Sequence, residues 1–101
     1  MTRTLFVFTA QGVAQPASGY RPGARHALLV FVRSRDIERA RSRAADFAAE
    51  QGWSHAEILR GKEIGRDLSS LADPTLRAAA EAAVANGASL VVYKDELRAD
   101  A

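Results

Sequence analysis

The chain has 101 residues, a formal net charge of +2 and no cysteine. This length suits one α+β domain, 1–101, with its own core, and a chain without cysteine has neither disulfides nor thiolate chemistry. No apolar run approaches the length of a membrane span, and the N-terminus lacks a signal-peptide pattern. We therefore expect a cytoplasmic protein with no membrane contact.

The charges are unevenly distributed along the chain. Residues 1–35 carry five arginines and no acidic residue, so this segment has a charge of +5. The other 66 residues hold nine basic and twelve acidic side chains and have a charge of −3. Arginine outnumbers lysine twelve to two, a bias that a GC-rich genome also produces without selection for binding.

Two apolar runs, 5–9 and 27–32, lie near the N-terminus. They lack polar alternation and are rich in β-branched and aromatic residues, which predicts strands covered on both faces. The segment between them, 10–25, contains three glycines and two prolines. This composition predicts a long exposed loop.

Apolar residues then recur at helical spacing, which predicts a helix over 36–51. Asp36 or Ser34 can cap its N-terminus, and Gly52 is placed to end it. The predicted buried stripe consists of Ile37, Ala40, Ala44, Phe47 and Ala48.

The second half of the chain predicts a short strand over 54–59 and a polar turn over 60–67, with room for a brief strand at 63–64. Asp73 followed by Pro74 is a strong helix start, and Asn86-Gly87 is a helix stop. A last strand covers 90–93, and 95–101 is expected to be a frayed tail. The buried stripe of the second helix is predicted as Leu76, Ala79, Ala80, Ala83 and Val84.

This order of elements predicts a ferredoxin-like split βαβ sandwich with an extra N-terminal strand. Two helices would cover one face of a sheet of four or five strands. The other face would be bare and apolar, so we expect a homodimer formed through the sheet. One shared core is predicted for Phe6, Leu29, Phe31, Phe47, Ile58 and Val91.

The preferred function is a small non-enzymatic interaction module, of an accessory, regulatory or immunity type, that presents a basic loop to an acidic protein partner. Tyr20, Arg21 and Arg25 combine an exposed aromatic ring with two cations on a Pro/Gly-shaped loop, as in interface hot spots. Helical spacing stacks three further cations along one helix face. These are Arg35, Arg39 and Arg43, and Arg33 would extend the surface if it lay on the same side.

The alternative is a small enzyme, or a binder of an anionic metabolite, with a pocket between sheet and loop. His26 would line that pocket, and His55 with Glu57 would form an acid/base pair on one strand face. The histidine spacing and the missing cysteines predict no metal site, and no cofactor is implied. Nucleic acid is a less favoured partner, because the net charge is mild and the phenylalanines lie in buried runs.

Overall fold

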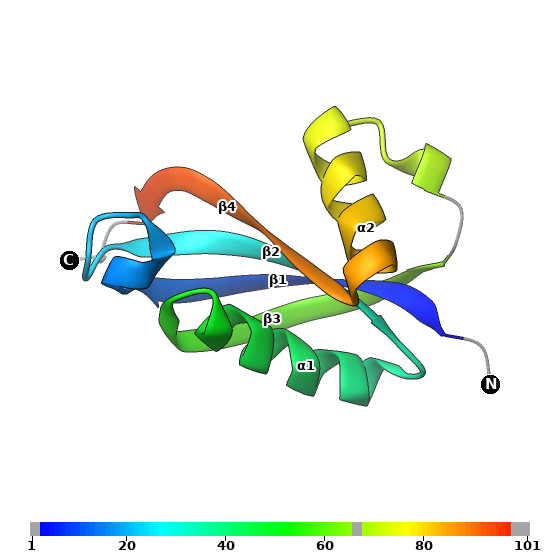
Figure 1. Ribbon diagram of the computed structural model, residues 1–101, viewed down its shortest axis with the longest axis horizontal. Coiled ribbons are helices and arrows are strands. Elements are labelled where there is room, and N and C mark those ends of the chain that lie inside the picture. Colours follow the sequence, from blue (N-terminus) through cyan, green and yellow to red (C-terminus); the bar gives the residue numbers. More distant parts are fainter. Residues whose placement is uncertain (1–2, 66–67, 98–101) are drawn as a thin grey trace.

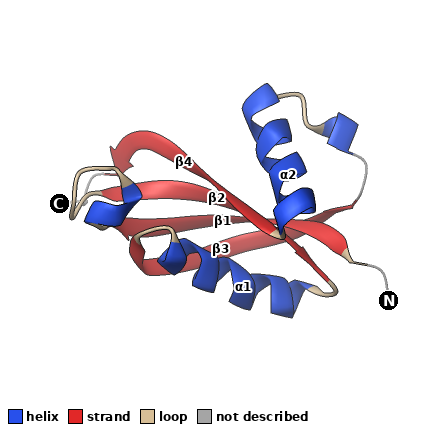
Figure 2. Cartoon of the chain, in the orientation of Figure 1, coloured by secondary structure: helices blue, strands red, loops and turns tan. Residues whose placement is uncertain are grey.

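The computed structural model describes residues 3–65 and 68–97. Within these ranges the chain is an α+β fold with a four-stranded antiparallel sheet and two α-helices (Figures 1 and 2). The strands are β1 (Thr4–Ala14), β2 (Arg25–Ser34), β3 (Trp53–Gly65) and β4 (Ala88–Leu97). The helices are α1 (Ile37–Glu50) and α2 (Pro74–Asn86), and short 3-10 turns cover Pro16–Ser18 and Leu68–Ser70.

The strands lie in the order β3-β1-β2-β4, and each neighbouring pair is antiparallel. The β1–β2 hairpin is the centre of the sheet, and α1 carries the chain from β2 across β1 to β3. This order does not reproduce the expected ferredoxin-like arrangement. The described residues contain no fifth strand, because the brief strand expected at 63–64 is the end of β3.

The two helices cover opposite faces of the sheet, so the prediction that they share one face was wrong. Successive residues of β1 and β2 therefore pack against different helices. Phe6 and Val30 pack with Ala44 of α1, whereas Leu5 and Phe31 pack with α2. Figure 1 shows α1 running along the strands and α2 crossing them near one end. Because a side chain points to the face opposite its neighbour's, unalternated apolar runs fit a sheet that is covered on both sides.

The predicted single core is therefore divided in two. Phe6, Phe47 and Ile58 belong to the cluster under α1, whereas Leu29, Phe31 and Val91 belong to the cluster under α2. The expected homodimer depended on one bare face. Since each face carries a helix, that reason no longer applies, and the association state stays a prediction.

The loop between the first two strands is shorter than the predicted 10–25, because β1 continues to Ala14. Gly12 lies inside this strand where a Cβ would come within 3.2 Å of the Trp53 Cβ, so a close approach explains the glycine better than a turn does. The hairpin closes through the backbone N–H groups of Ala14 and Gly23, which donate to Ala24 and Ala14 at 2.8 Å.

Both helix starts confirm the capping signals. The Asp36 carboxylate accepts the Arg39 N–H at 2.8 Å, and the Asp73 carboxylate accepts the Thr75 N–H at 2.8 Å. The buried stripes are narrower than predicted, because Ile37 is 40% exposed and Val84 is 42% exposed.

Two strands extend beyond their predicted ends. The predicted turn over 60–65 is the second half of β3, and β4 continues through 95–97 of the expected tail. Residues 66–67 of that turn and 98–101 of the tail lie outside the described residues. Within the described ranges, neither helix combines the length and apolar character needed to cross a membrane.

Candidate functional site: an arginine pocket

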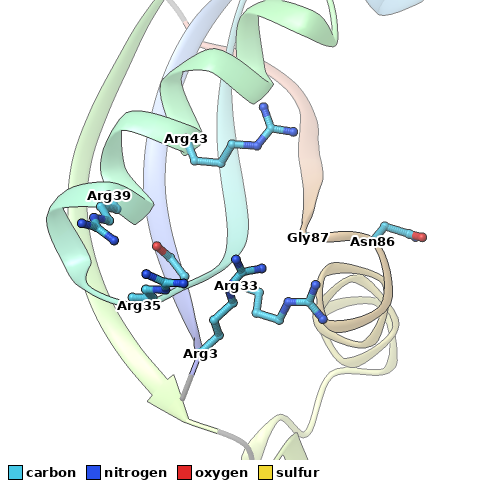
Figure 3. A pocket seen from close by; sticks show the side chains of 8 residues that line it. Arg3, Arg33, Arg35, Arg39, Arg43, Asn86 and Gly87 are labelled. Atoms are coloured by element: carbon cyan, nitrogen blue, oxygen red, sulfur yellow. The ribbon is translucent and has the colours of Figure 1, made fainter. Parts of the chain in front are cut away.

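A pocket of about 380 Å³ lies beside the end of β2, the first half of α1 and the turn from α2 to β4 (Figure 3). Arginine side chains from separate parts of the chain surround it, and its described lining contains no acidic residue. We call this site the arginine pocket. It is lined by Arg3, Arg33, Ser34, Arg35, Arg39, Arg43, Asn86 and Gly87.

Arg33 anchors one wall of the arginine pocket. Its backbone N–H donates to the Gly87 carbonyl at 2.9 Å, and its Nη1 donates to the Val84 carbonyl near the C-terminus of α2. Helix C-termini carry negative partial charge, so this contact stabilises the cation. The Arg33 Nε–H is buried and has no acceptor in the described part of the chain. The guanidinium of Arg33 is therefore only partly satisfied by the fold.

Helix α1 supplies a second wall. Arg39 and Arg43 are one turn apart, and each pairs with one carboxylate: Arg39 with the N-cap residue Asp36 and Arg43 with Glu50 of α1. The Arg39 Nε lies 3.4 Å from Asp36, and the Arg43 Nη1 lies 2.8 Å from Glu50. These side chains are largely exposed, so water screens both pairs. Both arginines therefore keep donors available to a further anion.

The remaining positive charges of the pocket have no acidic partner in the part of the chain that the structure describes. Among the described residues, neither Arg3 nor Arg35 forms a salt bridge. Five guanidinium groups around one pocket repel each other, and two exposed carboxylates offset only part of that charge. A planar guanidinium donates paired hydrogen bonds to a carboxylate or phosphate. The arrangement is therefore suited to holding an anion.

The loop arginines lie at the other end of the sheet. Arg25 begins β2 and Arg33 stands near its end, a separation of about 26 Å along an extended strand. Arg21, Arg25 and Tyr20 thus do not join the arginine pocket. The predicted binding residues form two separate groups, and only Arg35, Arg39 and Arg43 line one pocket with Arg33.

Arg21 already has an anionic partner within the chain. Its Nε donates to the Glu96 carboxylate at 2.9 Å, and its Nη2 contacts the second oxygen of that carboxylate. This hydrogen bond lowers the pKa of Glu96 below its usual value and raises the pKa of Arg21. The pair joins the loop to β4 and offsets the positive charge of Arg21.

Tyr20 is half-buried rather than exposed. Its ring centroid lies 4.9 Å from that of His26 and 5.8 Å from that of Trp53. His26 is only 1% exposed, and its Nδ1–H donates to the Tyr93 carbonyl at 2.8 Å. Its Nε2 is buried and has no partner among the described residues. Tyr20 and His26 thus belong to an aromatic cluster of the core.

The described structure gives no support for an acid/base pair between His55 and Glu57, which stays a prediction. Both are exposed, and no hydrogen bond joins them in the described structure. The β1–β3 register shifts beside them, and His55 has a φ of 50° in the left-handed region. This β-bulge makes the pairing irregular, but the exposed His55 and Glu57 still alternate with the half-buried Ala56 and Ile58. The described residues also contain no group of three His, Asp or Glu side chains that could hold a metal ion.

Four lining residues are not among the binding residues predicted from the sequence: Arg3, Ser34, Asn86 and Gly87. Arg3 precedes β1, and Asn86 was interpreted only as part of a helix stop. The one available signal was the basic N-terminal segment, in which Arg3, Arg33 and Arg35 all stand. No protein family, curated protein or solved structure matches this chain.

Proposed function

We propose that this protein is a binding module that holds an acidic segment of a partner protein in the arginine pocket. The observation that carries the proposal is that five arginines line one pocket whose described lining has no acidic residue. The pocket offers positive charge and hydrogen-bond donors, which serve recognition of an anion directly.

The spacing of Arg39 and Arg43 favours a peptide ligand with several carboxylates over a ligand with a single anionic group. Arg39 and Arg43 are four residues apart on α1, which places them about 6 Å from each other along the helix axis. An extended peptide repeats the side chains of one face about every 7 Å. Two acidic residues of such a segment, separated by one residue, can therefore pair with successive arginines.

The size of the pocket favours a second candidate, a binder of a small anionic metabolite. A volume of about 380 Å³ falls within the range of small-molecule sites, and the Ser34 hydroxyl and the Asn86 amide add neutral hydrogen-bonding groups. Both candidate functions use the same arginines. A comparison of the affinities for an acidic peptide and for a small anion therefore distinguishes them.

The test is calorimetric titration of the protein with a glutamate-rich peptide at low ionic strength. The double variant Arg35→Ala/Arg39→Ala should weaken binding by about tenfold or more, because two charge-assisted contacts are lost. Arg25→Ala is the matched control, since it removes an exposed arginine at the other end of β2. Added salt should weaken the wild-type interaction through screening of exposed charges.

Two results would redirect the proposal. Loss of binding in Arg25→Ala and Tyr20→Ala, with none in the double variant, would place the partner surface on the loop. Tight binding of citrate or pyrophosphate, with no measurable binding of the peptide, would favour the metabolite candidate.

A further inference from the structure

A larger cavity, of about 650 Å³, lies on the other face of the sheet beside α2. Its floor includes Val7, Leu29 and Phe31, which belong to the face that α2 covers at one end only. Leu71, from the segment before α2, and Leu76, from the first turn of α2, form a wall. We call this cavity the α2 groove. It shares no lining residue with the arginine pocket.

The wall of the α2 groove is fixed in position. Arg77 donates to the Leu71 carbonyl through Nε at 3.0 Å and Nη2 at 2.7 Å. Asp73 caps the N-terminus of α2: its carboxylate accepts the N–H of Thr75 at 2.8 Å and the N–H of Leu76 at 3.3 Å. The groove is therefore built into the fold before any ligand arrives, which reduces the ordering cost of binding.

Cations stand at one rim of the α2 groove. Arg60 and Lys62 lie on β3, an edge strand, and both are exposed. The register places Lys62 beside Val7, and Val7 beside Phe31. Lys62, Val7 and Phe31 thus lie in one row across three neighbouring strands, which are about 4.8 Å apart. The cation therefore lies directly beside the apolar floor of the groove. The described lining contains no acidic residue.

We propose that the α2 groove binds a free organic acid with an extended apolar body and one carboxylate. The body would lie over Val7, Leu29 and Phe31, between the α2 wall and the half-exposed Tyr93. The carboxylate would pair with Lys62 or Arg60 at the rim. A second copy of the chain would suit a purely apolar groove, whereas two cations in a described lining without acidic residues call for an anionic head group.

The probe is sodium decanoate, titrated calorimetrically below its aggregation concentration. Decanol and decylammonium are the neutral and charge-reversed controls. One decanoate should bind per chain, about tenfold more tightly than decanol, because only decanoate gains the charge-assisted contact. Lys62→Ala should weaken decanoate binding several-fold and leave decanol binding unchanged. Lys94→Ala, an exposed lysine on β4 outside the groove, should change neither.

Three results would overturn this proposal. One is equal affinity of the protein for decanoate and decylammonium, which would show that the rim cations do not select an anionic head group. Another is the absence of saturable decanoate binding. The third is a dimeric mass in light scattering together with protection of Lys62 from amine labelling, which would place a second copy on the groove. None of these results depends on the arginine pocket.

Discussion

At the scale of single residues, close packing explains a glycine that looked like part of a turn. Gly61 is the cross-strand neighbour of Phe8, whose ring is fully buried in the cluster under α1. A Cβ at this position would lie 2.3 Å from both Cδ1 and Cε1 of that ring. An aromatic ring lying over a strand glycine stabilises the pair, so the glycine is required by its neighbour.

Gly61→Ala should therefore destabilise the protein by about 1–3 kcal/mol, the usual range for overpacking a tight core. Chemical denaturation followed by circular dichroism measures this change in the free energy of unfolding. Combining Gly61→Ala with Phe8→Leu should cost less than the two single changes together, because the smaller side chain leaves room for the methyl group. Full additivity of the two changes would contradict the packing account.

At the scale of elements, the Arg21–Glu96 pair connects the loop after β1 to the end of β4. The hydrogen bond from Arg21 lowers the pKa of Glu96, so the folded state favours the ionised carboxylate. The stabilisation is present above the pKa of Glu96 in the unfolded chain. It is lost as the pH falls through the lower folded pKa. The side chains are exposed, so the contribution to stability is small.

A carbon-detected NMR titration of the Glu96 carboxyl should give a pKa below the ordinary glutamate value of 4.5. In the Arg21→Ala variant this pKa should rise, because the hydrogen-bond donor is gone. The same low pKa in both proteins would show that another group stabilises the carboxylate.

The elements defined by local signals were predictable from sequence. Asp36 and Asp73 cap helices because their side chains accept nearby backbone N–H groups, a relation that lies within three residues. The extension of β1 through Gly12 was not predictable in this way. It depends on pairing with Trp53, which approaches from a strand about forty residues later and would make a tight contact with any Cβ at Gly12. The face that each helix covers also follows from strand pairing between distant segments.

At the scale of the whole molecule, the fold separates charges that are close in sequence. The basic N-terminal segment is divided along the length of β2. Arg3, Arg33 and Arg35 line one pocket, whereas Arg25 lies at the far end of the strand. Helical spacing predicted that Arg35, Arg39 and Arg43 share one helix face; all three line the pocket, but Arg35 precedes α1. The contribution of Asn86 was not predictable, because the C-terminus of α2 reaches the pocket only through the pairing of β2 with β4.

The central claim is that the arginine pocket binds an acidic segment of a partner protein. The most direct measurement is a nitrogen–proton NMR titration with a glutamate-rich peptide, following the Nε–H signals of the arginines and the side-chain amide of Asn86. The signals of the pocket arginines and Asn86 should shift together and saturate at one peptide per chain, while those of Arg21 and Arg25 stay in place. Shifts confined to Arg21 and Arg25, with the pocket signals unmoved, would contradict the claim.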